Sequence, residues 1–373
     1  MRILKKLVAV LLGSVLVLII ATTLVMRQPQ FGKSPQGERL ERIKASPNFK
    51  EGSFKNINFT PFLSDGYSMT KITLEFVFKT FPRTVPKSQI PSVKTDLKNL
   101  SLDQDVLIWF GHSSYYFQLN GKRFLVDPVF SGSASPISFT TKSFAGTDFY
   151  QAEDFPEIDY LLISHDHYDH LDYKTIKELK PKIKQVICGL GVGSHFEYWG
   201  FEPGIIHEKD WNEQLDLGSN LTLHTATARH FSGRSFTRNN TLWMSYLLEA
   251  GDFKVYIGGD SGYDTHFAAI GEKFDGVDLA ILDNGQYNLA WKEIHMLPEE
   301  VLKASRDLGA KRLFPVHSSK FVLANHAWDE PLNKVSEYNE ANFVCPLVTP
   351  RIGEIVYLKD STQKFSSWWR EIS

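Results

Sequence analysis

Residues 163–172 read ISHDHYDHLD, so that three histidines and three aspartates stand within ten positions. The apolar run IDYLLI, residues 158–163, leads directly into this stretch. Burying so many polar side chains without partners would cost several kcal/mol, and the like charges would repel one another. The stretch therefore suits neither a packed core nor an ordinary turn, and metal binding is the interpretation that its residue types favour.

The spacing of these side chains indicates more than one metal ion. Neutral imidazole and carboxylate are ligands of zinc and related first-row metals. One tetrahedral ion cannot easily use every ligand of an H-x-H-x-D-H loop, whereas two adjacent ions can. Two ions about 3.5–4 Å apart lower the pKa of a water that bridges them and stabilise both oxygens of a displacement. We therefore predict a hydrolytic site with two metal ions per chain, of zinc or a similar first-row metal. The loop supplies His165, His167, Asp169 and His170.

Other histidines and aspartates follow apolar runs further along the chain. His230, Asp260 and His317 each stand near the end of a predicted strand. Strand ends converge on one rim of a sheet, which is where sites form in mixed α/β folds. We expect these three side chains to join the loop at 163–172.

Hairpins and helices alternate along the body of the chain. Asn120-Gly121 and Gly251-Asp252 stand between apolar runs and predict two hairpins, the first with two strands over residues 106–130. Helices are expected over 172–180 and from Pro298 to Gly309. This order predicts an α/β (α+β) fold with two mixed sheets covered by helices.

The first residues have a different composition. Residues 7–26 are uncharged and would span about 30 Å as a helix, the thickness of a bilayer core. A secretory signal peptide is the alternative, although its apolar region is usually shorter and ends in small residues. Basic residues within positions 1–6 favour a cytoplasmic N-terminus and an exported body.

The remaining chain divides into three parts. Residues 27–104 contain a proline-rich stretch and are expected to form a linker and wrapping extension. The hydrolase domain is expected over 105–358, followed by a tail at 359–373 that packs against it. The net charge of -2 gives no indication of nucleic-acid binding. Cys188 and Cys345 are predicted to be packed thiols.

The order of these motifs resembles the metallo-β-lactamase superfamily over roughly residues 105–358. The resemblance implies a four-layer αβ/βα sandwich and a two-metal site that usually contains zinc. It implies that Asp260 bridges the two ions. It implies His165, His167 and His230 as ligands of the first ion, and Asp169, His170 and His317 as ligands of the second.

Four shorter motifs are similar to those of the phospholipases D that hydrolyse N-acylphosphatidylethanolamine. This similarity implies that His295 lies near the substrate phosphate and donates a proton to the leaving oxygen. His295 and Asp169 are thus the predicted catalytic residues. The segment between Asp283 and His295 and the apolar N-terminus depart from the mammalian enzyme, so its acyl-binding surface is not carried over. The similar stretches are WFGHSS (109–114), LVDPVFSGSASP (125–136), GGDSGY (258–263) and IHMLPEE (294–300).

For two other polar residues, both a role in the site and a purely structural role stay open. The remaining polar residues are interpreted as structural. His112 either orients a metal ligand or is a packed core histidine, and Asp127 either supports the site or caps a loop. Asp166 and Tyr168 alternate with the ligands and should face away, whereas Asp172 should cap the following helix. Histidines without supporting context are interpreted as structural: His195, His207, His224, His266 and His326.

These observations predict a membrane-anchored, binuclear zinc phosphodiesterase of phospholipase D type that acts on a lipid or small-molecule phosphodiester. A lactone or amide hydrolase on the same fold is one alternative, because function depends on loops rather than on the fold. A non-catalytic metal-binding envelope protein is another, although all seven ligand positions are filled. His167 argues against a diiron oxidoreductase, and the absence of cysteine from the ligand positions argues against a β-lactamase.

Overall fold

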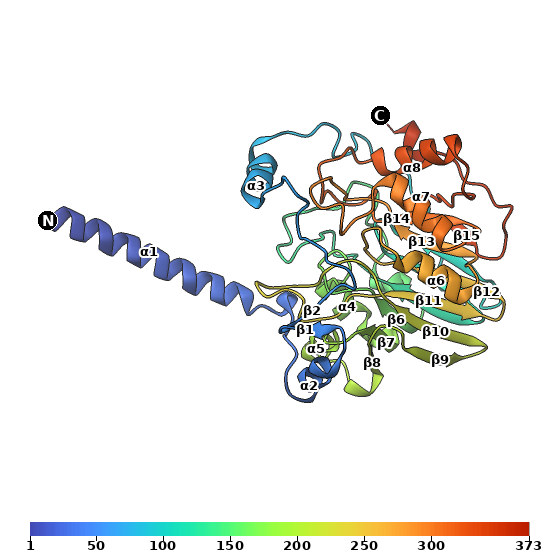
Figure 1. Ribbon diagram of the computed structural model, residues 1–373, viewed down its shortest axis with the longest axis horizontal. Coiled ribbons are helices and arrows are strands. Elements are labelled where there is room, and N and C mark those ends of the chain that lie inside the picture. Colours follow the sequence, from blue (N-terminus) through green and yellow to red (C-terminus); the bar gives the residue numbers. More distant parts are fainter. Residues whose placement is uncertain (373) are drawn as a thin grey trace.

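Strand β3 (Val106–Trp109) is buried along its whole length, and its side chains alternate between two cores. Leu107 and Trp109 enter a core between the two large sheets, whereas Val106 and Ile108 enter a core beneath helices. Apolar side chains on both faces are typical of a sheet covered on both sides. The computed structural model, which describes residues 1–372, repeats this pattern in a helix–sheet–sheet–helix arrangement (Figure 1).

The first sheet has seven strands in the order β15-β3-β4-β5-β6-β7-β8. It is antiparallel from β15 to β5 and parallel from β5 to β8. Helices α4 (Tyr173–Leu179) and α5 (Gly193–Tyr198) cover its outer face through Ile176 and Phe196. The other strands are β4 (Tyr115–Leu119), β5 (Lys122–Val126), β6 (Ile158–Ile163), β7 (Ile183–Gly189), β8 (Ile206–Lys209) and β15 (Ile355–Tyr357).

The second sheet has six strands in the order β14-β13-β12-β11-β10-β9, and it is parallel from β14 to β12 and antiparallel from β12 to β9. Helices α6 (His266–Phe274), α7 (Pro298–Asp307) and α8 (Glu330–Ala341) cover its outer face. The predicted four-layer sandwich is confirmed. The strands are β9 (Gln214–Gly218), β10 (Leu221–Ala226), β11 (Ser245–Ala250), β12 (Phe253–Ile257), β13 (Leu279–Asp283) and β14 (Leu313–Val316).

Both predicted hairpins form at their predicted turns. Asn120 and Gly121 have φ angles of 48° and 75°, as a tight two-residue turn between strands requires. The prediction of two strands over 106–130 was wrong, because Gly111 and His112 also take positive φ and divide the first strand into β3 and β4. Strand β10 ends at Ala226, so His230 lies in the loop that follows.

Residues 27–104 were predicted to form a linker and wrapping extension, and they contain two helices that the sequence had not indicated. Helix α2 (Gly37–Ala45) forms because Ile43 enters the main core. Helix α3 (Met69–Phe78) begins where the Ser68 side chain caps the Lys71 amide. The remaining elements of this region are the 3₁₀ turn η1 (Pro29–Phe31) and the strands β1 (Phe49–Lys50) and β2 (Ser53–Phe54).

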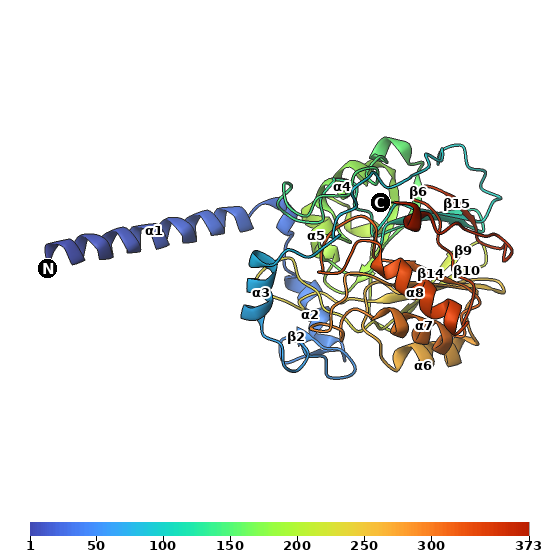
Figure 2. The same cartoon turned by 90° about the horizontal axis from the view of Figure 1, so that it is seen from above.

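Helix α1 (Arg2–Met26) leaves the body as a single straight rod with none of its residues buried (Figures 1 and 2). By length and composition it is apolar enough to cross a membrane, and a signal sequence would pass the same test. At the other end of the chain, Trp368 and Trp369 in η5 (Trp368–Glu371) are buried, as predicted for a packed tail. The remaining 3₁₀ turns are η2 (Ala152–Asp154), η3 (Lys180–Lys182) and η4 (Pro203–Ile205).

Candidate metal centre

The rims of the two sheets meet at the loop that follows β6. Gly259, just past β12, lies so close to the first sheet that a Cβ atom there would stand 2.8 Å from the Cβ of Ser164. Because β5 to β8 and β12 to β14 run parallel, their carboxyl ends open on the same side. This contact brings polar residues from both sheets together. They are His165, His167, Asp169 and His170 after β6, His230 after β10, Asp260 after β12, Asp283 at the end of β13, and His317 after β14.

The first group consists of His165, His167 and His230. The Nδ1 atom of His167 lies 2.8 Å from Nε2 of His165 and 3.3 Å from Nε2 of His230. Burial lowers the pKa of all three imidazoles, and those of His165 and His230 fall well below the usual value. Three neutral imidazoles whose nitrogens converge this closely suit a metal ion of zinc type.

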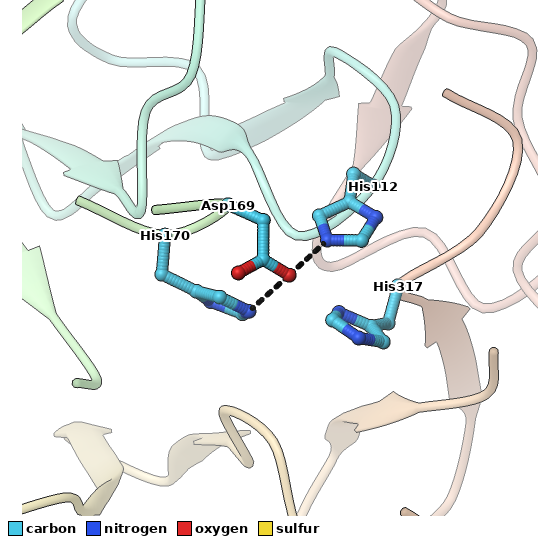
Figure 3. A group of neighbouring side chains, drawn as sticks. All are labelled: His112, Asp169, His170 and His317. Atoms are coloured by element: carbon cyan, nitrogen blue, oxygen red, sulfur yellow. Dashed lines mark hydrogen bonds and ion pairs between the residues drawn. The ribbon is translucent and has the colours of Figure 1, made fainter. Parts of the chain in front are cut away.

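The second group consists of His112, Asp169, His170 and His317 (Figure 3). The Oδ2 atom of Asp169 lies 2.9 Å from Nε2 of His112 and 3.5 Å from Nε2 of His170. Burial would raise the pKa of Asp169, but the neighbouring histidines outweigh it and hold that pKa well below the usual value. Asp169 is therefore an ionised carboxylate, and His112 orients it rather than filling a core.

Asp260 lies between the two groups. Its Oδ2 atom is 3.1 Å from Nε2 of His170, 3.9 Å from Nε2 of His165 and 3.8 Å from Nε2 of His230. Its Oδ1 atom is 3.1 Å from Nδ1 of His317 but makes no hydrogen bond with any residue of 1–372. A buried carboxylate oxygen without a donor is costly, and a metal ion would satisfy it. The donor set thus fits a metal centre in which Asp260 contacts both groups.

Outer hydrogen bonds fix the orientation of the ligand histidines. Asp127 Oδ2 lies 2.9 Å from Nδ1 of His170 and also accepts the Ser164 hydroxyl at 2.6 Å. Nδ1 of His165 is 3.0 Å from the Ser164 hydroxyl, and Nδ1 of His230 is 3.0 Å from the Ile294 carbonyl oxygen. Such partners select the tautomer that leaves Nε2 as the ligand atom. Asp127 therefore supports the site, which the sequence had left open.

Asp127→Asn is expected to lower zinc affinity by about 10–100-fold, because the amide no longer holds the His170 imidazole as the carboxylate does. Competition against a fluorescent zinc chelator measures the effect. Asp172→Asn is the matched control, since its carboxylate instead accepts from the Lys174 amide and the Thr175 hydroxyl. A wild-type zinc affinity in Asp127→Asn would show that Asp127 does not support the metal site.

His295 stands at the edge of the ligand set, where Asp283 holds it. Its Nδ1 atom is 2.8 Å from Asp283 Oδ2 and 4.0 Å from Asp260 Oδ2. Burial raises the pKa of Asp283 to about 7 against the opposing effect of His295. Burial lowers the pKa of His295, but Asp283 and Asp260 outweigh it and raise that pKa above the usual value. Each group therefore favours the charged form of the other.

Asp283 had not been identified as a site residue from the sequence. It is the last residue of β13, just as Asp260 follows β12, so its position after an apolar run was the available indication. Sequence reasoning had treated it only as the boundary of a divergent segment. Its pairing with His295 is a contact across twelve residues that periodicity does not reveal.

The residues predicted to face away do so. Asp166 accepts the Thr241 hydroxyl at 2.8 Å and the Gly233 amide at 2.7 Å, and it lies 3.1 Å from Nε2 of His195. The Tyr168 hydroxyl donates to the Arg234 carbonyl oxygen. The Asp172 side chain caps α4, as predicted. The other histidines contact groups outside the cluster: His207 with Gln185, His224 with Glu249, His266 with Ser261, and His326 with Gln286.

A cavity of about 260 Å³ opens above the cluster. Its floor is polar and includes Asp169, Asp260 and His295. Its walls are apolar, and they come from α3 and the segment before it as well as from loops that follow strands of the second sheet. The sequence had not placed the N-terminal extension at the site. The apolar lining consists of Phe62, Leu63, Met69, Ile72, Phe76, Phe231, Trp291, Ile294 and Leu323.

Comparison with known families identifies this arrangement. The beta-lactamase superfamily domain matches residues 122–318, which span the loop after β6 and every strand end that meets it. The chain belongs to the metallo-β-lactamase superfamily. This confirms the resemblance seen in the sequence, and the chain is a metallo-hydrolase of this superfamily.

Individual members of the superfamily are similar to this chain over most of its length. An uncharacterised protein of Mycobacterium tuberculosis is 36% identical over 332 residues, which cover 87% of this chain and 88% of that protein. The N-acyl-phosphatidylethanolamine-hydrolyzing phospholipase D 1 of Caenorhabditis elegans is 31% identical over 62% of this chain and 69% of its own. The metallo hydrolase Igni18 of Ignicoccus hospitalis shares the fold, with a TM-score of 0.52 at 19% identity over 68% of this chain and 97% of its own.

Proposed function

We propose that the chain is a membrane-anchored binuclear zinc hydrolase, a phosphodiesterase of phospholipase D type. The observation that supports this most directly is the His295–Asp283 pair, which holds the His295 ring beside the cluster with its Nδ1 atom 4.0 Å from the central carboxylate of Asp260. A phosphodiester with an alkoxide leaving group needs such a donor. The homology to a phospholipase D of C. elegans supports the same substrate class.

The ligand set divides between two ions. Asp260 contacts both groups and would be shared. When bound, two zinc ions would supply Lewis acidity and lower the pKa of the attacking water. His165, His167 and His230 would hold the first ion, and Asp169, His170 and His317 the second.

The protein's own groups then orient the substrate and move its proton. Asp283 engages Nδ1 of His295, so that Nε2 is the nitrogen left to donate to a leaving oxygen in the cavity. The apolar walls exclude water around the scissile bond, which strengthens the electrostatic interactions inside. Acyl chains of a lipid would contact the same walls.

The N-terminal helix supports attachment to a membrane. Its 25 residues exceed the roughly 20 needed to span a bilayer. We propose that residues 1–6 remain cytoplasmic, that residues 7–26 cross the membrane and that residues 105–358 act on its far side. A lipid substrate would then already be present at the enzyme's own surface.

Release of phosphatidic acid from N-acylphosphatidylethanolamine in mixed micelles tests the proposal. The zinc-loaded full chain is expected to release it, and Asp127→Asn at limiting zinc is expected to release less. Turnover of a soluble aryl phosphodiester without any lipid turnover would keep the phosphodiesterase and contradict the lipid substrate. Activity only on lactones or amides would contradict both.

Asp283→Asn is expected to move the basic limb of the pH dependence of kcat/KM to lower pH by about 1–3 pH units. His295 acts while protonated, so activity falls as pH rises through its pKa. Asp283 raises that pKa against the lowering effect of burial, and the amide removes this support. Initial rates on an alkyl phosphodiester across pH measure the limb. An unchanged limb would show that another group donates the proton.

A further inference from the structure

Helix α3 exposes a run of large apolar side chains to solvent. The α3 face consists of Met69, Leu74, Phe76, Val77 and Phe78. The side chains of Val77 and Phe78 are 66% and 78% exposed. Contiguous exposed apolar patches on a folded chain indicate a surface that binds another apolar surface.

The same helix also forms a wall of the catalytic cavity, and two residues of the α3 face, Met69 and Phe76, belong to both. Ile72 is buried there, and the Phe76 ring stacks on Trp291 with centroids 6.3 Å apart. Met69, Ile72 and Phe76 line the cavity that contains Asp169 and His295. The α3 face is therefore continuous with the entrance to the metal centre.

The position of α1 relative to this face indicates what covers it. In both views α3 lies at the end of the body from which α1 departs, and α1 runs along the long axis of the molecule (Figures 1 and 2). A bilayer crossed by α1 therefore has its surface beside α3. Strand β15 lies at the opposite end in both views.

The connection between α1 and the body is short and held by hydrogen bonds. Only two residues separate Met26, the end of α1, from Pro29, whose carbonyl oxygen accepts from Trp199 Nε1 at 2.9 Å. Arg234 Nη2 donates to the Gln30 carbonyl oxygen at 2.7 Å, and the Lys33 amide donates to His195 Nδ1 at 3.0 Å. These contacts attach the segment that follows α1 firmly to the body.

The same contacts continue to the metal-binding loop. The buried Arg234 also donates from Nη1 to the carbonyl oxygens of Asp166 and Leu171, at 2.7 Å each. The guanidinium thus ties the segment after α1 to the loop that bears the ligands. The metal centre is held at a fixed distance from the end of the membrane helix.

We propose that the α3 face inserts into the interfacial layer of a phospholipid bilayer, so that lipids enter the catalytic cavity directly from the membrane. This rests on the proposed function for the crossing of the bilayer by α1. Helix α3 carries a run of exposed apolar side chains, and Lys79 and Arg83 just past it form ion pairs with Glu75 and Asp329. Such a helix lies in the membrane surface with its apolar residues in the acyl boundary.

A lipid-quenching experiment on the full chain tests the insertion. A fluorophore is attached at Val77→Cys, with Leu12→Cys as the reporter of α1 and Tyr357→Cys on β15 as the matched control. Cys188 and Cys345 are free but buried, so the introduced thiol is the one that reacts. In vesicles of phosphatidylcholine and phosphatidylglycerol, doxyl lipids are expected to quench Val77→Cys and Leu12→Cys strongly and Tyr357→Cys weakly.

A charge substitution gives a second readout. Val77→Asp combined with Phe78→Asp is expected to reduce turnover of vesicle lipids by about tenfold or more. The reason is that two apolar side chains that would be buried in the bilayer surface are replaced by charged ones. Turnover of a soluble aryl phosphodiester should stay at the wild-type value, since neither residue lines the cavity. Tyr357→Asp should change neither rate.

The outcomes separate this inference from the proposed function. Quenching at Leu12→Cys with only control-level quenching at Val77→Cys would overturn the insertion of α3 and keep the anchor. Absence of quenching at Leu12→Cys would overturn the anchor and the inference together. Equal loss of lipid and soluble turnover in the double aspartate variant would show that α3 supports the cavity and does not bind the membrane.

Discussion

Asp169→Asn is expected to remove one of two zinc ions and to reduce turnover by about 10³-fold or more, which corresponds to about 4 kcal/mol of transition-state stabilisation. Asp169 is held ionised by His112 and His170, and it is the carboxylate that the second group does not share with the first. An amide keeps the shape but not the charge. Elemental analysis of the purified chain and initial rates on a phosphodiester measure both effects.

Asp172→Asn is the control, because it lies on the same loop and caps α4 without contacting the cluster. It should retain two zinc ions and near wild-type turnover. Full activity in Asp169→Asn with one bound ion would contradict a mechanism that needs two. If Asp169→Asn kept both ions but lost activity, Asp169 would instead orient the substrate and would not be needed to hold a metal ion.

His295→Ala is expected to lower kcat/KM by about 10²–10⁴-fold on an alkyl phosphodiester, the range that general acid catalysis typically contributes. The loss should be small on a nitrophenyl phosphodiester, since nitrophenolate leaves without a proton. The contrast between the two leaving groups therefore isolates proton donation from metal binding. Zinc content should stay at the wild-type value.

Equal losses on both substrates would contradict the role of His295 as a proton donor. They would show instead that the ring positions the substrate or supports the cluster through Asp260, from which it is 4.0 Å. His326→Gln is a suitable control, because His326 is a partly buried histidine that accepts the Gln286 amide and does not line the catalytic cavity.

The local motif was the most predictable part of the site. His165, His167, Asp169 and His170 lie within one loop, and their residue types alone limit the chemistry. His230, Asp260 and His317 were predicted from their positions near the ends of apolar runs, and the structure brings all of them to the same rim. That inference works because strand direction determines where a chain emerges from a sheet.

The missed features all depend on contacts between distant segments. Helix α3 is only ten residues long, and it becomes part of the site because Ile72 and Phe76 pack toward Trp291, more than two hundred residues away in the sequence. The pairing of Asp283 with His295 is likewise a tertiary contact. Arg234 reaches the segment after α1 through backbone carbonyl oxygens, which no sequence pattern indicates.

The positions of charge in the site also follow from tertiary structure. Asp166 and Asp169 lie in one loop, yet Asp166 is bound by Thr241 and Gly233 while Asp169 faces the histidines. Alternation along the loop predicted that division. It did not predict that His195, interpreted as structural, would join Asp166 to the segment that follows α1.

Hydrolysis in ¹⁸O-labelled water tests the central claim most directly. N-acylphosphatidylethanolamine contains phosphodiester, amide and carboxylic ester bonds, so the position of the label identifies the bond that water attacks. Mass spectrometry of the products from the zinc-loaded chain should find ¹⁸O in the phosphate of phosphatidic acid. Label in a released fatty acid, with the phosphate unlabelled, would show attack at a carbonyl carbon and contradict a phosphodiesterase.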